Sequence, residues 1–237
     1  MSEWKFRRFW QDAALVDLPD GWQVVLDGKP VNTPGKLPLV LPTLPLGQAV
    51  VAEWDAVDEV VNPGAMPLTR AANTAIERVT PQFDGVAAML ADYGGTDLLS
   101  YRADRQEALR REQAAAWDPL LDWAGDVLGA RLVVTGGVIP VAQDPAAIRA
   151  LAGHVTALDV WGLTALHELV TLSGSLVLGL AVLHGRLSAN DAHGLARLDE
   201  AYQARIWGPD EEAEAAAEAR RRAMADAERL WQLSRPA

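Results

Sequence analysis

The densest group of carboxylates in the chain lies in RLDEAYQARIWGPDEE, residues 197–212. Carboxylates that converge in space can perform general acid–base chemistry or bind a divalent cation. The spacing of these acids specifies neither role, and surface helices are rich in acids. A metal-assisted hydrolase therefore remains one alternative for this stretch, with four acids as its candidate ligands or bases: Glu200, Asp210, Glu211 and Glu212.

The sequence contains none of the common signatures for nucleotide binding or nucleophilic catalysis. A phosphate-binding glycine loop, a G-x-G-x-x-G motif and a G-x-S-x-G nucleophile elbow are all absent. His167-Glu168 lacks the second histidine of a zinc-binding helix. The spacing of the four histidines suggests no shared helical face: His154, His167, His184 and His193. We therefore predict no catalytic residue, no cofactor, no metal site and no small-molecule substrate.

The composition is that of a folded, soluble protein. The chain has 237 residues, of which 50% are hydrophobic, and it contains no cysteine, which excludes disulfides and thiol chemistry. Its formal net charge of −11 argues against nucleic acid or an anionic membrane as a partner, because both need a basic surface. The N-terminal MSEWKFRRFWQD lacks the apolar core of a secretory signal.

The longest apolar run, residues 163–185, is predicted to be a buried helix and not a membrane span. It contains His167, Glu168 and a Ser-Gly-Ser, whereas a span has to be almost wholly apolar. A helix that is apolar all round is expected where neighbouring elements cover every side. Within this run, Gly174 and Ser175 are expected to permit close helix packing.

The elements that must position these residues fall into two regions, which predicts an α+β protein of two domains. Residues 1–65 form the smaller domain, with short antiparallel strands in ALVDL, WQVVL, PVNT and LPLVLP, followed by a helix over 45–57. Asp27-Gly28 is a strong signal for a two-residue hairpin turn. The prolines that flank LPLVLP suit an edge strand.

Residues 66–237 form the larger, mainly helical domain. RLVVTGGVI at 131–139 is the exception and predicts a strand or a short hairpin. Trp54 falls on an apolar helical stripe and is expected in the core, and Met66 is expected to plug a loop between the two domains. Helices are predicted over 68–79, 81–92, 105–128, 145–156, 159–184, 188–206 and 210–232.

The helix predicted over 188–206 begins with a capping box formed by Ser188 and Asp191. Its buried stripe follows from helical spacing: Ala192, Leu195, Leu198, Tyr202 and Ile206. At about 100° per residue, Glu200, Gln203 and Trp207 share a different face. A tryptophan there must be covered by the next helix or offer apolar area to a partner.

Gly208-Pro209 is predicted to end this helix and to start the next one. Proline is favoured at a first helical position, and the three acids at 210–212 complement the positive end of a helix dipole. This interpretation needs no function for Asp210 and Glu211. No helix start explains Glu200.

Eight segments of the chain stand in a specific order and spacing: RFW at 8–10, LDGKPVNTP at 26–34, LPT at 41–43, AEWDA at 52–56, MPLTRAANTAIE at 66–77, WDPLLDW at 117–123, SGSLVLGLA at 173–181 and DEAYQARIWGPDEE at 199–212. Together they resemble the assembly chaperones that bind the alpha subunit of the F-type ATP synthase catalytic sector. YGGTDLLSYRA at 93–103 departs from that family, which more often has an apolar residue before Thr-Asp, and this affects only local packing.

The resemblance implies a chaperone that is not an enzyme. It would hold the free alpha subunit and cover the surface that alpha later presents to the beta subunit, until beta displaces it without ATP hydrolysis. Such exchange needs an exposed apolar anchor with charged neighbours. The residues that supply this combination are Glu200, Gln203, Trp207, Glu211 and Glu212.

The family has members in bacteria and in mitochondria. The resemblance therefore implies a protein of the bacterial cytoplasm or, for a processed eukaryotic member, of the mitochondrial matrix. An adaptor for another protein assembly would use the same surface and is the second alternative to the chaperone.

Overall fold

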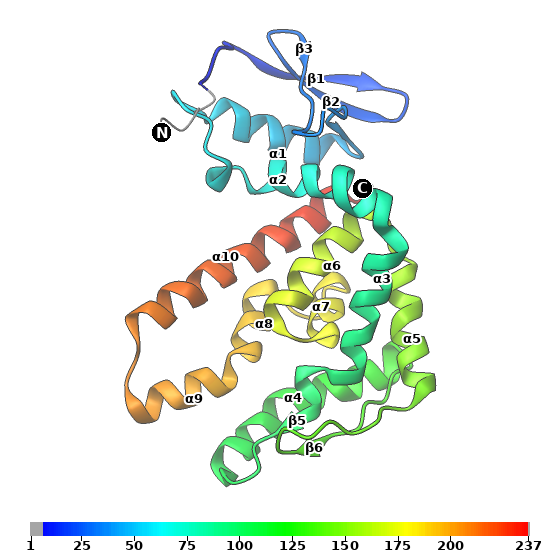
Figure 1. Ribbon diagram of the computed structural model, residues 1–237, viewed down its shortest axis with the longest axis vertical. Coiled ribbons are helices and arrows are strands. Elements are labelled where there is room, and N and C mark those ends of the chain that lie inside the picture. Colours follow the sequence, from blue (N-terminus) through cyan, green and yellow to red (C-terminus); the bar gives the residue numbers. More distant parts are fainter. Residues whose placement is uncertain (1–6, 237) are drawn as a thin grey trace.

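The computed structural model describes residues 7–236, which fold into two lobes (Figure 1). The smaller lobe contains a four-stranded sheet and the first helices, and the larger lobe is helical. This is the predicted α+β fold. One cluster of buried side chains includes residues of both lobes, so the division into domains at residues 65 and 66 stays a prediction.

The small sheet is built around β2 (Gly21–Leu26). All of its partners are antiparallel: β1 (Ala13–Leu18), β3 (Lys29–Pro30) and β4 (Val40–Leu41). Asp27 and Gly28 connect β2 to β3 and have φ angles of 47° and 76°. Two positive φ angles are what a tight two-residue hairpin turn requires. The predicted hairpin is confirmed, and LPLVLP contributes only two residues to the sheet.

Helix α1 (Leu44–Asp55) packs against β1 and β2. Gly47 permits the close approach, since a Cβ there would lie 2.8 Å from a methyl carbon of Leu15. Trp54 on the same helix is buried, and its ring centroid lies 5.3 Å from that of Trp10. The predicted core position of Trp54 is confirmed.

A carboxylate joins α1 to the helices that follow it. Glu53 accepts hydrogen bonds from the N–H groups of Leu68 and Thr69, both at 2.8 Å, and from the Thr69 hydroxyl at 2.7 Å. These N–H groups belong to the first turn of α2 (Pro67–Thr74) and have no partner inside the helix. Met66, which precedes α2, is buried, as expected of a plug in this loop.

The larger lobe consists of helices, most of them joined by short connections; the exception is the long loop between α4 and α5. α2 continues directly into a π-helical turn at Ala75–Val79. The helices after it are α3 (Phe83–Asp92), α4 (Glu107–Val127), α5 (Pro145–Thr156), α6 (Val160–Ser173), α7 (Leu176–Leu183), α8 (Ala189–Ala196), α9 (Leu198–Trp207) and α10 (Glu211–Ser234). Short 3₁₀ turns lie at Pro63–Ala65, Thr80–Gln82, Tyr93–Thr96 and Leu98–Ser100. Most of the predicted helices are confirmed to within a few residues.

The apolar run at 131–139 contributes little regular structure. Only β6 (Thr135–Gly136) is a strand, and it pairs in parallel with β5 (Tyr101–Arg102). The side-chain amide of Gln143 closes the loop by bonding the N–H of Val133 at 2.7 Å and its carbonyl at 3.0 Å. The predicted strand is therefore confined to two residues.

The single helix predicted over 159–184 is wrong, because the chain breaks at Gly174. This glycine has a φ of 72° and ends α6, and Ser175 caps α7. The buried carboxylate of Asp97 accepts hydrogen bonds from the Ser175 hydroxyl at 2.7 Å and from the Val177 N–H at 3.0 Å. Burial raises the pKa of Asp97, and these hydrogen bonds oppose that shift.

Every residue of α7 is buried, as predicted for the apolar run. The close packing of α6 and α7 depends on Gly179, where a Cβ would lie 2.8 Å from a methyl carbon of Val170. Gly174 and Ser175 were expected to permit close helix packing, but they form the turn between α6 and α7. Over residues 7–236, no helix is both long and apolar enough to span a bilayer.

Helix α10 runs obliquely across the larger lobe, from the arm-like extension that contains α9 to the smaller lobe (Figure 1). It packs along α6, where Gly162 leaves room for Trp231, since a Cβ would lie 2.7 Å from a ring carbon. The Trp231 indole donates to the carbonyl of Leu183 at 2.9 Å. Near its C-terminal end, the carbonyl of Leu233 accepts the hydroxyl of Thr43, directly before α1. α10 therefore ties the two lobes together.

Replacing Asp97 by asparagine should destabilise the protein. An amide has one acceptor oxygen in place of two and turns an NH₂ toward groups that donate, so a buried hydrogen bond is lost at about 1–3 kcal/mol. Asp126→Asn is the matched control, because Asp126 makes an exposed ion pair with Arg131 and should cost less than about 0.5 kcal/mol. Denaturant unfolding of both variants measures the difference, and equal midpoints would contradict it.

Two glycine-to-alanine changes in helices should have opposite effects. Gly162→Ala forces a methyl group against Trp231 and should destabilise the fold by about 1–3 kcal/mol. Gly85→Ala in α3 meets no atom within 4 Å and should stabilise it by about 0.5–1 kcal/mol through helix propensity. Thermal unfolding curves recorded side by side test this pair. A destabilised Gly85→Ala would show that propensity is not the governing effect there.

Candidate functional site

The carboxylate-rich stretch follows α8, whose start agrees with the sequence prediction. The hydroxyl of Ser188 accepts the N–H of Asp191 at 3.0 Å, and the Asp191 carboxylate lies 3.4 Å from the N–H of Ser188. The predicted capping box is therefore confirmed.

The single helix predicted over 188–206 is wrong, because the chain turns at Arg197 and a second helix, α9, begins. The carbonyl of Leu195 accepts the indole N–H of Trp117 at 3.1 Å. A side chain that binds a helix carbonyl is a recognised cause of kinks. Because Trp117 lies in α4, the break depends on a residue that is distant in the sequence.

α9 and residues 208–216 form an arm that projects from the larger lobe (Figure 1). No residue of α9 is buried. Ile206, predicted on the buried stripe, is 51% exposed. The predicted stripe is therefore wrong at Ile206, because α9 leaves the core after Leu198, which still packs against it.

Polar contacts hold the arm against α4. The side-chain amide of Gln113 donates to Asp199 at 2.7 Å, and Arg205 forms an ion pair with Glu112. The guanidinium of Arg205 also lies 5.3 Å from the ring centroid of Tyr202. Exposed ion pairs each contribute about 0–1 kcal/mol, so the arm is held in position without a core of its own.

Trp207 lies at the end of the arm and is 80% exposed. Its indole N–H donates to the side-chain oxygen of Gln203 at 3.0 Å, which confirms that these two residues share a face. The helix after Pro209 does not cover the ring. Trp207 is thus a large apolar side chain that is left in contact with solvent.

Glu200 lies nearer the body and is bound within the chain. It belongs to the first turn of α9, so a helix start does explain an acid there, contrary to the prediction. Its carboxylate pairs with Arg197 at 2.8 Å and with Arg220 of α10 at 3.1 Å. Arg197 also binds Glu214 at 2.9 Å, and the hydrogen bonds with Glu214 and then Glu200 raise the pKa of Arg197. Glu200 therefore ties α9 to α10.

The acids after Trp207 have two different roles. Asp210 is the N-cap of α10, and its carboxylate accepts the N–H groups of Glu212 at 2.9 Å and Ala213 at 3.2 Å. Pro209 consequently precedes the cap and does not occupy the first helical position predicted for it. Glu211 and Glu212 are exposed in the first turn, and neither makes an ion pair within the described chain.

Further along α10, charges are neutralised locally. Hydrogen bonds from Arg221 and Arg222 lower the pKa of Glu218 to about 2. His193 of α8 is buried. This burial is the main cause that lowers its pKa, and the positive charge of Arg197 lowers it further. The only acids of the candidate set left without a partner in residues 7–236 are therefore Glu211 and Glu212.

The sequence analysis missed the arginines that position the arm. Arg197 stands three residues before Glu200, a spacing that allows an ion pair on a helix, so this pair could have been found. Arg220 lies 20 residues after Glu200. Only the antiparallel course of α9 and α10 brings the two together.

The described residues offer no metal site. No group of three or more His, Asp or Glu side chains there could hold an ion. Glu200 is bound by two arginines and Asp210 by two backbone N–H groups. The four acids considered as a hydrolase site are therefore occupied or dispersed.

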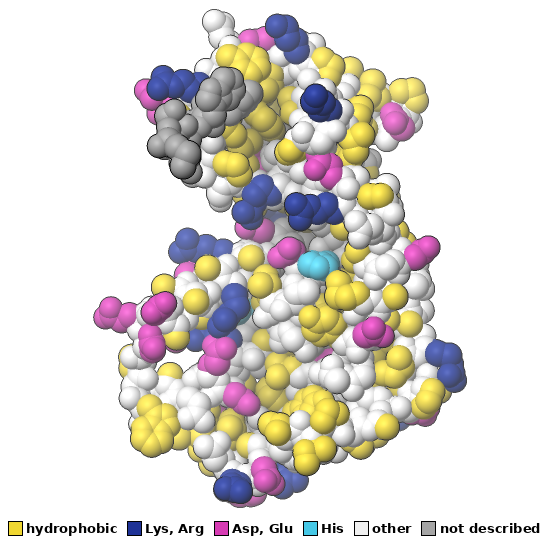
Figure 2. Space-filling view, viewed as in Figure 1, with side chains coloured by type: hydrophobic (Ala, Val, Ile, Leu, Met, Phe, Trp, Pro, Cys, Tyr) yellow, Lys and Arg dark blue, Asp and Glu magenta, His cyan; other side chains and the backbone are white. Residues whose placement is uncertain are grey.

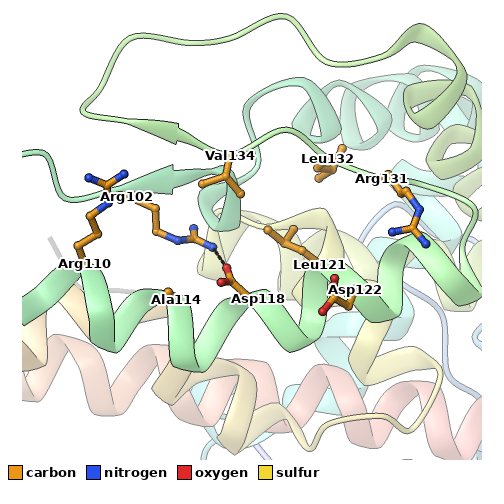
Figure 3. A pocket seen from close by; sticks show the side chains of 9 residues that line it. All are labelled: Arg102, Arg110, Ala114, Asp118, Leu121, Asp122, Arg131, Leu132 and Val134. Carbon is orange, nitrogen blue, oxygen red and sulfur yellow. Dashed lines mark hydrogen bonds and ion pairs between the residues drawn. The ribbon is translucent and has the colours of Figure 1, made fainter.

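A cavity of about 470 Å³ lies between α4 and the segment that leads into β6 (Figure 3). Arg102 crosses it to bind Asp118 at 2.6 Å, as the dashed line shows. The Arg102 side chain is buried, and its guanidinium lies 5.1 Å from the ring centroid of Trp117. This ion pair fixes β5 on α4.

Comparisons with known proteins give a consistent result. A family described as ATP12 chaperone protein matches residues 7–125. The structure of Atp12 from Paracoccus denitrificans is 60% identical, with a TM-score of 0.96, and the match covers 98% of this chain and 100% of that one. A variant of the same protein with lysine in place of an aspartate matches equally well, over 99% of this chain and 100% of that one, with 60% identity and a TM-score of 0.96. Atu1473 from Agrobacterium tumefaciens is 40% identical, with a TM-score of 0.90, over 95% of this chain and 85% of that one.

Truncating the exposed tryptophan should leave folding intact. Trp207→Ala should change the free energy of unfolding by less than about 0.5 kcal/mol, because the ring is uncovered. Trp117→Ala is the contrasting variant and should cost about 3–5 kcal/mol, because that ring is buried in the core. Chemical denaturation measures both. A loss of more than 2 kcal/mol for Trp207→Ala would place its ring in the folded core.

Proposed function

The chain belongs to the ATP12 chaperone family, and we propose that it binds the free alpha subunit of the F-type ATP synthase catalytic sector. It covers the surface that alpha later presents to the beta subunit, and beta displaces it. No step requires ATP hydrolysis by the chaperone, because exchange is driven by the competing affinity of beta for the same surface.

The observation that carries this proposal is the exposure of Trp207 at the end of the arm. Tryptophan is among the residues that most often dominate binding energy at interfaces. Glu211 and Glu212 follow it without an ion pair in the described chain and give the anchor an acidic border. An acidic border selects for a partner with basic groups beside an apolar pocket.

The ties within the arm support the same role. Glu200 holds α9 to α10 through Arg220, and Asp199 holds α9 to α4 through Gln113. A partner therefore meets Trp207 in a defined position and does not have to order the arm on binding, which reduces the entropic cost. Gln203 further restrains the indole ring.

The magnitude of the anchor suits a displaceable partner. Burying a tryptophan removes about 150–250 Å² from water, which at about 25 cal/mol per Å² corresponds to about 4–6 kcal/mol. Association costs about 4–15 kcal/mol in lost freedom of motion. Trp207 alone is therefore insufficient, and binding requires additional contacts.

The proposed setting is the cytoplasm of a bacterium, in agreement with the 60% identity to the P. denitrificans protein. For a processed eukaryotic member the corresponding compartment is the mitochondrial matrix. The net charge of −11 makes nucleic acid an unsuitable partner. An adaptor that binds another assembly through the arm is the competing hypothesis, and alpha-subunit binding separates the two.

Light scattering by isolated alpha subunit tests the proposal. The wild-type protein in excess should suppress the scattering, and added beta subunit should release alpha into an alpha–beta complex. Trp207→Ala should lose at least tenfold in affinity for alpha because it removes the apolar anchor. Val138→Ala, which truncates an 89% exposed residue on another loop, is the control and should behave as wild type.

Unchanged aggregation of alpha with wild-type protein would refute the chaperone function for this partner. Normal protection by Trp207→Ala would instead remove the arm from the interface. Glu200→Lys is a poor probe of binding, because it places a cation beside Arg197 and Arg220 and disturbs the arm itself. Glu211→Lys and Glu212→Lys test the acidic border without that complication.

A further inference from the structure

A groove separates the two lobes on the face seen in Figure 2, where the surface is hollowed and charged side chains gather. It consists of two adjoining cavities of about 410 and 590 Å³. Thr74, Thr164 and Glu168 line both cavities, so the two are continuous. We call this feature the interlobe groove and define it by six residues: Arg70, Thr74, Arg78, Thr164, Glu168 and Asp226.

Small side chains form much of the lining. Ala71, Thr74, Ala165 and Ala227 leave space for a main chain to approach the helices closely. Thr164 is buried, and its hydroxyl donates to the carbonyl of Val160 at 2.7 Å, so this group is satisfied within its own helix. The small side chains of the lining let an extended chain lie close against the helices.

The two walls carry opposite charges. Arg70 and Arg78 come from α2 and the turn after it, whereas Glu168 of α6 and Asp226 of α10 face them. Across the described groove, no arginine and carboxylate approach within 4 Å, and Glu168 is only 3.9 Å from His167 on its own helix. Burial raises the pKa of Asp226, with Arg229 and Arg70 opposing the shift. Each wall therefore presents charge that a ligand can still neutralise.

The spacing of the arginines sets the shape of the ligand. Arg70 and Arg78 are eight positions apart, and because a π-helical turn lies between them, the rise is somewhat less than the about 12 Å of a regular α-helix. Four residues of an extended strand cover about 13 Å, and alternate side chains point to opposite edges. Acidic side chains at positions i and i+4 of a strand would reach both arginines, while basic side chains between them would face Glu168 and Asp226.

We propose that the interlobe groove binds an extended segment of the alpha subunit that has acidic side chains four residues apart and a basic side chain between them. The inference rests on the proposed function and adds a second contact to the one at Trp207. α10 contributes to both, since it begins at the arm and lines the groove at Asp226. From Glu211 to Asp226 it spans about 22 Å, a distance within the reach of one folded subunit.

The charge pattern disfavours other ligands. A nucleotide or nucleic acid would meet Arg70 and Arg78 but would be repelled by Glu168 and Asp226. A uniformly basic peptide would be repelled by the arginines in turn. Only a ligand with charges of both signs on opposite edges satisfies both walls, and an extended polypeptide has this arrangement through its alternation of side chains.

A single cysteine tests where the client lies, because the chain has no cysteine of its own. Thr74→Cys, labelled with a photoreactive crosslinker, should crosslink to one stretch of the alpha subunit that mass spectrometry identifies as carrying the acidic–basic pattern. Ala157→Cys, at the exposed end of α5 outside both cavities, is the matched control and should give no such product.

Charge reversal tests why the client lies there. Arg70→Glu combined with Arg78→Glu should lower the crosslinking yield at Thr74→Cys by about tenfold, because both acidic contacts become repulsive. Arg149→Glu combined with Arg186→Glu reverses two exposed arginines outside the groove and should leave the yield unchanged. Thermal unfolding of both double variants checks that each is folded.

The outcomes separate this inference from the proposed function. If alpha is bound by the wild-type protein but Thr74→Cys and Ala157→Cys crosslink alike, the groove is not a binding site and the chaperone function stands. Crosslinks between two copies of this chain would likewise overturn the groove assignment. If alpha is not bound by any variant, both proposals fail together. An equal yield from the two double variants would exclude recognition by charge.

Discussion

The arrangement of the larger lobe depends on one buried carboxylate. Asp97 is fully buried, and its hydrogen bonds go to the start of α7, through Ser175 and Val177. A buried acid without such donors would be costly, so α7 has to begin there and α6 has to end before it. The short helix α7 then supports α8, from which the arm departs. Asp97 thus fixes the start of α7, on which α8 packs, while Trp117 and the contacts with α4 set the direction of the arm.

The core and the arm are stabilised by different forces. α7 is buried along its whole length, whereas α9 has no buried residue and relies on polar contacts such as Arg197 to Glu200. Exposed ion pairs are weak individually, so the arm gains position without much stability. Because Trp207 is exposed, its ring adds little to the stability of the fold, and its exposure is consistent with a surface that binds a partner. This division lets binding residues change without loss of the fold.

The two lobes are joined by a few long-range bonds. Thr43, directly before α1, binds the carbonyl of Leu233 at the end of α10, and α2, whose first turn Glu53 caps, packs on α6 and α10. These contacts hold the lobes on either side of the interlobe groove. α10 is the common element, since it starts in the arm, lines the groove and ends against the smaller lobe. A partner that contacts both the arm and the groove would therefore bind along a single helix.

Much of the fold could be predicted from the sequence because it is encoded by near neighbours. The hairpin at Asp27-Gly28, the capping box at Ser188 and the core position of Trp54 follow from residues a few positions apart. The family, too, was evident from the order of its segments. The pairing of Gln203 with Trp207 followed from helical spacing alone.

The rest was decided by partners distant in the chain. The sequence of the apolar run at 159–184 predicts one helix, but the Asp97 carboxylate accepts a hydrogen bond from Ser175 at the point where the helix breaks. The run at 188–206 likewise predicts one helix, but the Trp117 indole binds the carbonyl of Leu195 beside the second break. Glu200 looked free because Arg220 approaches it only in the folded chain. Helical periodicity records which face of a segment is apolar, but it contains no information about which distant side chain will interrupt the backbone.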